Sequence, residues 1–241
     1  MKRIGILPII LTAAIVFSYC KKNDEDNCIQ GDGNLIQETR NVDDFKEIHA
    51  SGAYNISFSQ INNTSVDLFG DSNILPIINT TVNNGILNIG TNSNDCYSTQ
   101  NTLEITATAQ YFEGITLDGA GKIEAHNIAT TELHYVTNGS ATINSSFNAD
   151  NFSVTITGSG DAQFAGSAEN GVFSIGGAGG VQASTMSVDI CTITIEGTGN
   201  VYIHVISEMN VTITGTGSIY YTGDPDINSN ISGTGQIIKV D

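Results

Sequence analysis

A glycine-rich triplet that recurs at nearly constant spacing is the feature of this 241-residue chain that most restricts its fold. The triplet is Gly-x-Gly or a close variant, and successive copies lie 20, 19, 19, 20, 18 and 18 residues apart. The first glycines of the seven copies are Gly119, Gly139, Gly158, Gly177, Gly197, Gly215 and Gly233. A phosphate-binding loop needs only one such triplet, whereas seven at this interval indicate a repeated structural unit.

The residues around the triplet alternate in polarity. The position two before each first glycine holds Leu117, Thr137, Ile156, Ile175, Ile195, Ile213 and Ile231. The position four after it holds Ile123, Ile143, Ala162, Val181, Val201, Ile219 and Ile237. The intervening position three before it is mostly Thr, Ser or Asn, and a period of two predicts strands with one buried face. We therefore predict an all-β, single-domain parallel β-helix with about 18–20 residues per coil, and glycine where a positive φ or a close backbone approach is needed.

The same pattern continues more faintly upstream. Ile48, Gly52, Ile56 and Phe58 fit the register, and the stretch 66–74 repeats it 18 residues later, which predicts a second coil there. Residues 77–113 contain strand-like runs that break the period, as longer coils or an insertion would. The predicted domain spans residues 35–241, with regular coils from about 111 to 241 and less regular coils over 35–110.

The N-terminus carries an export signal. Lys2 and Arg3 precede an apolar run over residues 4–17, which predicts a signal peptide over residues 1–19. Cys20 then fits a bacterial lipoprotein cleavage site, although an ordinary signal peptide cut near the same point is the alternative. The polar stretch 20–34 reads as a flexible tether, and its "KKNDED" is typical either of a signal for the outer surface or of a solvated tether. We expect an outer-membrane lipoprotein of the cell envelope, surface-exposed or periplasmic, attached to the membrane by its lipid.

Charge excludes one class of partner. The chain has 8 Lys and Arg against 25 Asp and Glu, and removal of residues 1–19 leaves 6 against 25, a net charge of −19 with neutral His. No basic stripe is present, so nucleic acid is not an expected partner. The sequence predicts no cofactor.

Three cysteines lie beyond Cys20. Cys28 and Cys96 stand in polar, turn-rich sequence, and they could pair in an oxidising compartment or stay apart. Cys191 lies at an apolar position of the alternating pattern, which predicts a buried, unreactive side chain.

Several ordered motifs resemble a known family. They are an "F-x-x-I" followed by a Gly turn (Phe45 to Gly52), "V-x-L-x-G-D-x-N-I-L" (Val66 to Leu75), "N-G-x-L-x-I" (Asn84 to Ile89), and repeated "SGSG-x-I"-type coils. Over about residues 35–241 the chain resembles the auto-transporter adhesin head GIN domain family, secreted bacterial β-helix proteins of uncharacterised function. The resemblance implies a right-handed parallel β-helix, and adhesion only by analogy.

The candidate catalytic groups are scattered. A glycosidase needs two carboxylates about 5–10 Å apart. Asp118 and Glu196 share a column four coils apart, roughly 19 Å by strand spacing, and Asp161 and Glu124 stand alone in theirs, although acids of different columns could still meet. His126 and His204 are also four coils apart, too far to share a metal ion. We therefore expect no enzyme and no metal site.

One outward column is richer in binding chemistry. It includes Gln163, Gln182, Tyr202 and Tyr220 on successive coils. Two tyrosines with their flat faces outward, flanked by amides, would form a platform for sugar rings. The alternative is a cross-strand aromatic pair that only stabilises the sheet.

The expected function is binding rather than catalysis. A β-helix with polar ladders along its sides suits adhesin-like binding of a glycan or a protein ligand. A structural or accessory protein of the periplasmic envelope is the alternative, and a polysaccharide-active enzyme is the weaker one.

Overall fold

The computed structural model describes residues 28–92 and 95–240. The strands are β1 (Ile29–Gln30), β2 (Leu35–Arg40), β3 (Glu47–Gln60), β4 (Ser65–Asp71), β5 (Asn79–Asn83), β6 (Ile86–Gly90), β7 (Tyr97–Ser98), β8 (Leu103–Ala109), β9 (Gly114–Thr137), β10 (Thr142–Ile156), β11 (Ala162–Ile175), β12 (Val181–Ile195), β13 (Val201–Ile213), β14 (Ile219–Thr222), β15 (Asp226–Ile231) and β16 (Ile237–Lys239). Within the described residues the only helical segment is a 3₁₀ turn, η2 (Leu75–Ile77). No helix in this part of the chain has the length and hydropathy to cross a bilayer. The predicted signal peptide and Cys20 lie outside the described residues.

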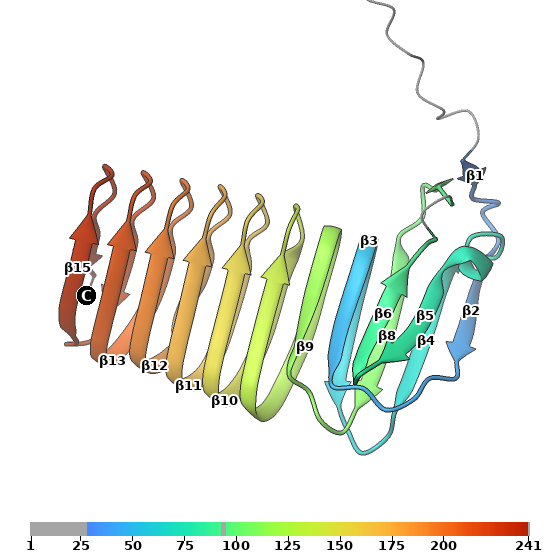
Figure 1. The fold of residues 1–241 in the computed structure, drawn as a ribbon, viewed down its shortest axis with the longest axis horizontal. Helices are drawn as coiled ribbons and strands as arrows, with labels where there is room; N and C mark the ends of the chain where they lie inside the picture. The colour runs from blue at the N-terminus through green and yellow to red at the C-terminus, as the bar shows by residue number, and fades with distance from the viewer. Residues whose placement is uncertain (1–27, 93–94, 241) are drawn as a thin grey trace, which may run out of the picture.

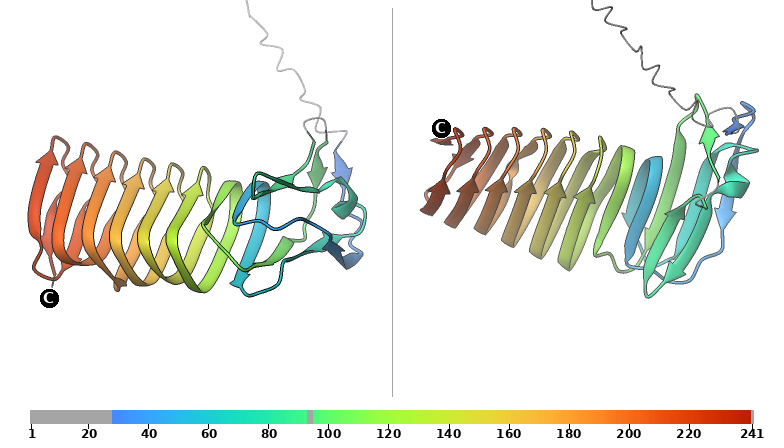
Figure 2. Two further views of the ribbon diagram at one scale, coloured as in Figure 1. Left: turned by 60° about the horizontal axis from the view of Figure 1, so that its bottom comes forward. Right: turned by 45° about the horizontal axis from the view of Figure 1, so that its top comes forward.

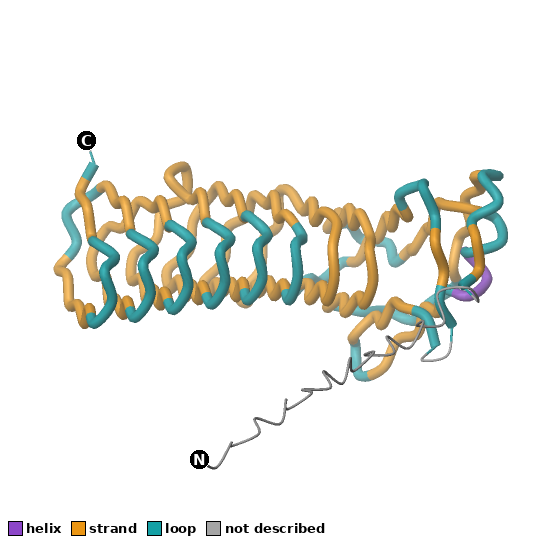
Figure 3. Tube along the Cα trace, turned by 90° about the horizontal axis from the view of Figure 1, so that it is seen from above, coloured by secondary structure: helices purple, strands orange, loops and turns teal. Residues whose placement is uncertain are grey.

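The chain folds into a β-solenoid of about six turns (Figure 1). From β9 to β16 each strand pairs in parallel with the strand one turn away. Each regular turn consists of a first leg that leaves the Gly-x-Gly loop, a bend, and a second leg that returns to the next loop. In β10 the bend is at Asp150, which the pairing with β9 and with β11 skips. The loops line up along the upper edge in Figure 1 and appear as a row of teal segments in Figure 3. The predicted parallel β-helix is confirmed, while its right-handed sense stays a prediction.

The register is the one that the sequence columns predict. Ile156, Ile175, Ile195, Ile213 and Ile231 are aligned on five successive turns, and the first four are fully buried. Aromatic rings fill the core near the middle of the solenoid, where Phe152 contacts the rings of Phe147, Phe164 and Phe173. Alternation along each leg therefore places one continuous apolar core between the two legs.

The N-terminal strands do not stack in chain order. β3 pairs with β9 in parallel, with Gly52 opposite Gly119, so the predicted register of β3 is confirmed. On its other side β3 pairs with β6 and β8, which come later in the chain (Figure 2). The second coil predicted at residues 66–74 is wrong: β4 runs antiparallel between β2 and β8. Alternation shows which side chains face inward, and it is the same in parallel and antiparallel strands, so it could not reveal this.

The two ends of the solenoid differ. At the N-terminal end β2, β4 and η2 form an antiparallel cap, and Asn84 and Gly85, both with positive φ, make the tight turn between β5 and β6. At the C-terminal end the last strands, β15 and β16, each pair on one side only in the described structure. Every side chain of β15 is exposed. The polar groups of the last turn therefore face solvent.

Close backbone approach, rather than a positive φ, explains the glycine column. After Gly119, no first glycine of a triplet has a positive φ. A β-carbon on Gly177 would lie 1.8 Å from the carbonyl oxygen of Gly158, one turn earlier, and the other turns give 1.7–2.0 Å. That oxygen also accepts the N–H of Ala178, at 3.0 Å. Only glycine allows the corner loops to stack at strand spacing.

Two neighbouring glycines test this reading. We expect Gly177→Ala to lower the free energy of unfolding by about 3 kcal/mol or more, because backbone must move. Gly176→Ala should change it by less than about 1 kcal/mol, because the nearest atoms to its β-carbon are 3.9 Å away. Urea denaturation of both variants measures the difference. Equal losses would show that the loops have room to separate.

Candidate functional site

The ladder predicted as a sugar platform forms in the expected register. Gln163, Gln182, Tyr202 and Tyr220 lie opposite one another on successive first legs. The two tyrosine rings are stacked, with centroids 4.6 Å apart and planes at 8°. This separation is close to the strand spacing of about 4.8 Å, so the rings stack along the solenoid axis.

This stacking changes what the ladder can bind. One flat face of each ring covers the other, so the rings of Tyr202 and Tyr220 do not lie with their flat faces outward as the sequence analysis expected. Parallel strands bring identical side chains into register, and two aromatic rings at this distance gain more from mutual contact than from exposure. The ladder therefore presents ring edges, together with the exposed amides of Gln163 and Gln182, to a ligand. Glycan binding by these residues stays a proposal.

The second legs carry a different polar ladder. The amide of Asn151 donates to Glu132 at 2.6 Å, and the amide of Asn170 donates to Asn151 at 3.0 Å. Beside them is a shallow hollow of about 380 Å³ that His134 and Val172 help to line. Both sides of the solenoid thus display hydrogen-bonding groups in rows at strand spacing.

Two of the acids and both histidines singled out in the sequence contact a residue of the next turn. Asp161 accepts the backbone N–H of Gly180 at 2.7 Å, and Asp118 accepts the amide of Asn138 at 2.5 Å. His126 contacts the hydroxyl of Ser146 at 3.3 Å, and His204 contacts that of Thr222 at 2.8 Å. Each of these interactions links one turn to the next.

The alignment of the sequence repeats did not predict one cluster of ionisable groups. The carboxylate of Glu47 lies 3.9 Å from Nε2 of His49 and 3.8 Å from Nε2 of His134. These are ion-pair distances, and no three His, Cys, Asp or Glu side chains in the described part of the chain are arranged to hold a metal ion. The cluster forms because β3 lies beside β9, a neighbour relation that the repeat does not show.

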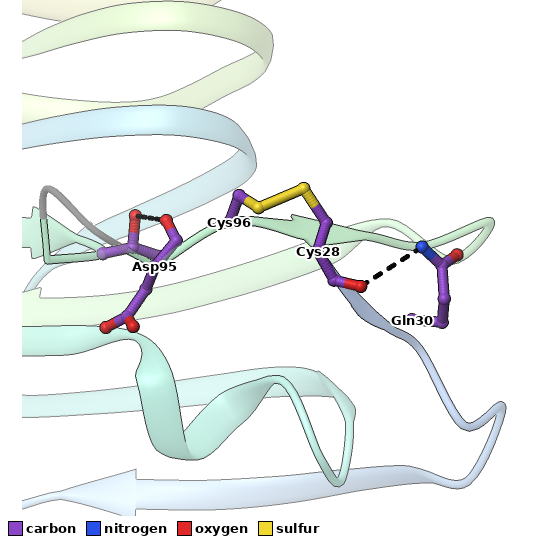
Figure 4. Close-up of a disulfide and its surroundings, with 5 residues drawn as sticks. Cys28, Gln30, Asp95 and Cys96 are labelled. Atoms are coloured by element: carbon purple, nitrogen blue, oxygen red, sulfur yellow. Dashed lines mark hydrogen bonds between the residues drawn. A yellow bond between two sulfur atoms is a disulfide. The ribbon is translucent and has the colours of Figure 1, made fainter. Parts of the chain in front are cut away.

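A disulfide fixes the start of the described chain. Cys28 and Cys96 are joined, with Cα atoms 4.8 Å apart (Figure 4). The N–H of Ile29 donates to the carbonyl of Cys96. The amide of Asn73 also donates to the carbonyl of Gln30 at 2.6 Å. The flexible tether predicted for residues 20–34 therefore does not extend over residues 28–34, because these contacts hold that stretch against the cap. The polar, turn-rich composition of this stretch is the same for a flexible tether and for a loop that packs against the domain, so the sequence did not distinguish the two.

Asp71 is the anchor of this end of the molecule. Its side chain has no exposed surface, and it accepts hydrogen bonds from the hydroxyl of Thr99 at 2.5 Å, the N–H of Gly33 at 2.7 Å and the amide of Asn101 at 3.2 Å. The Thr99 hydroxyl, followed by the N–H of Gly33 and the amide of Asn101, holds the pKa of the carboxyl below its usual value. The "G-D" of the sequence motif therefore ties three separate segments together.

Cys191 behaves as its position in the repeat predicts. It is fully buried in the core of β12, and burial raises the pKa of its thiol. A thiol kept protonated and out of solvent is a packing group rather than a nucleophile.

The comparisons with known proteins agree with this architecture. The family described as "Putative auto-transporter adhesin, head GIN domain" matches residues 44–225. The chain belongs to this family. No protein with a curated description matches it significantly.

Solved structures of proteins from Bacteroides and Parabacteroides share the fold of this GIN-domain chain. A protein from Bacteroides fragilis, titled a putative adhesin, superimposes with a TM-score of 0.78 at 24% identity over 88% of this chain and 100% of that one. A Parabacteroides distasonis protein, titled a putative lipid binding protein, gives 0.69 at 21% over 88% and 99%. A putative adhesin from Parabacteroides merdae gives 0.65 at 21% over the same shares. At these identities the likeness shows the fold alone.

The lowered pKa of Asp71 makes a pH-dependent prediction. The ionised carboxylate stabilises the fold above its usual pKa of 3.8, and this contribution is lost as the pH falls through the lower folded-state pKa. We expect Asp71→Asn to lower the thermal midpoint at neutral pH, because the new amide points donors at Thr99 and Asn101. The difference in thermal midpoint between this variant and the unmodified protein should become smaller at about pH 2.

The matched control is Asp150→Asn, which changes an exposed carboxylate in β10. It should leave the midpoint almost unchanged at both pH values. If the loss in thermal midpoint caused by Asp71→Asn were the same at both pH values, the ionised carboxylate of Asp71 would not be what stabilises the fold.

Proposed function

We propose that this chain is a lipid-anchored protein of the cell envelope that binds a glycan or protein ligand, in the manner of an adhesin, along the sides of its solenoid. The observation that carries the proposal is the ladder on the first legs, where exposed Gln163 and Gln182 continue in register into the edges of Tyr202 and Tyr220. Amides and phenols repeated at strand spacing match the regularly spaced hydroxyls of an extended polysaccharide. The adhesin names within the family support this reading.

The disulfide supports a place outside the cytoplasm. Disulfides persist in the periplasm and at the cell surface, and are rare where glutathione and thioredoxin keep thiols reduced. Cys28 is only eight residues beyond Cys20, so a lipid on Cys20 would hold the capped end of the solenoid near the membrane. The uncapped C-terminal end and both sides of the solenoid would then extend away from it.

Location is the first property to measure. We expect antibodies against the solenoid to label intact cells as strongly as permeabilised ones, and Cys20→Ala to release the protein from the membrane fraction. Labelling only after permeabilisation would favour the alternative, an accessory protein of the periplasmic side. Retention of the Cys20→Ala variant in the membrane would contradict lipid anchoring.

Binding is the second property. We expect the mature chain to bind neutral polysaccharides on a glycan array, and Gln163→Ala/Gln182→Ala to weaken binding at least about tenfold, a change of about 1.4 kcal/mol. The control, Asn151→Ala/Asn170→Ala, removes a similar pair of amides from the second legs. If only this control variant lost glycan binding, the binding face would lie on the second legs instead. Absence of any glycan signal would leave a protein ligand, to be sought by crosslinking on intact cells.

A further inference from the structure

A pocket lies where the disulfide-linked loop meets the first corner of the solenoid. Its volume is about 520 Å³, within the range of small-ligand sites. One wall is the stretch 97–102, and the other comes from β3 and β9, at residues 53–55 and 120–121. It is separate from the ladders along the sides.

The lining combines aromatic rings with uncharged polar groups. Tyr54 and Tyr97 supply the rings, and Asn55, Gln100 and Thr102 supply amides and a hydroxyl. No Asp, Glu, Lys, Arg or His is among the described residues that line it, although the whole chain carries a net charge of −17. A neutral ligand with both apolar and hydroxyl-bearing faces fits this lining, and a sugar ring has that character.

A buried hydroxyl in this lining is poorly satisfied: it interacts with the phenol of Tyr97 without a well-formed hydrogen bond. Tyr54 is 1% exposed, and its hydroxyl makes no hydrogen bond of normal geometry. The phenol of Tyr97 lies beside it, and burial raises the pKa of both, so both are protonated donors at neutral pH. A buried polar group with a poorly formed hydrogen bond costs free energy, and a ligand hydroxyl that reaches this pair of phenols would recover it.

The structure holds the pocket walls in place. A β-carbon on Gly52, whose φ is +145°, would lie 2.8 Å from the ring of Tyr54, so glycine clears the space for that ring. The opposite wall is fixed by the disulfide at Cys96, next to Tyr97, and by Asp71, which bonds Thr99 and Asn101. The disulfide and the hydrogen bonds of Asp71 therefore both act on one wall of this pocket. Binding sites gain affinity from such preorganisation.

We propose that the pocket between Tyr54 and Tyr97 binds a single neutral sugar residue, and so selects one unit or end of the glycan. The inference rests on the proposed glycan-binding function and adds to it a specificity-determining subsite. The amides of the ladder would then contribute contacts along the chain of the glycan.

The test uses the mature chain and a panel of glucose, galactose, mannose and N-acetylglucosamine, followed by NMR of the backbone amides. At least one sugar should shift the signals of residues 97–102 and 120–121. Tyr54→Phe and Tyr97→Phe, which each remove one oxygen, should each weaken that binding at least about tenfold. Tyr54→Phe should not lower the thermal midpoint, because it deletes a buried hydroxyl that makes no hydrogen bond of normal geometry. Glucuronic acid, which adds a carboxylate to the glucose ring, should bind more weakly than glucose.

The control is Tyr202→Phe/Tyr220→Phe, which should leave the shifts at residues 97–102 unchanged. Shifts confined to the ladder, or full binding by both pocket variants, would overturn the pocket while leaving glycan binding in place. No shift with any of the four sugars would also overturn it. If the glycan array were negative as well, glycan binding itself would be overturned, and only the protein-ligand form of the proposed function would remain.

Discussion

Contact between successive corner loops is the constraint on which the solenoid depends. In each Gly-x-Gly triplet the carbonyl oxygen of the first glycine points at the next turn, where it accepts the N–H of the middle residue, as in Ser159 to Gly139 at 2.9 Å and Thr198 to Gly177 at 2.9 Å. A β-carbon on the next glycine would overlap the same oxygen, so no side chain fits. The hydrogen-bond ladder of the sheets therefore continues through the corners, which keeps the two legs of every turn in one register and the apolar core continuous.

This constraint also explains which parts of the structure the sequence could predict. From Gly119 onward each turn repeats the same local solution, so the column of Gln163, Gln182, Tyr202 and Tyr220 could be read from spacing alone. The ring orientation could not, because the columns show which residues are neighbours and leave their rotamers open. In the N-terminal third the neighbours of β3 are β9, β6 and β8, all distant in sequence, and the alternation of polar and apolar residues is the same for either direction of β4. The clusters that depend on those pairings, at Asp71 and at Glu47, carried no periodic signal.

The two regions of the protein use different kinds of interaction. The regular turns are held by repeated backbone bonds and by an apolar core, and their outer side chains are free to vary. The N-terminal cap is held by single, specific interactions: one disulfide, one buried carboxylate and one tight turn at Asn84 and Gly85. Such interactions hold in place irregular loops that have no equivalent in a neighbouring turn to pair with. The pocket between Tyr54 and Tyr97 lies where the two regions meet.

The position of β3 between β8 and β9 has a consequence for the order of folding. Ile56 meets Ile123 and Ile105 only after more than 40 intervening residues have been made, and closing such long loops is entropically slow. Each later turn needs a loop of only 18–20 residues, and it adds to an edge that already exists. Formation of the β8–β3–β9 unit is therefore the expected rate-limiting step, after which the remaining turns add in sequence toward the C-terminus.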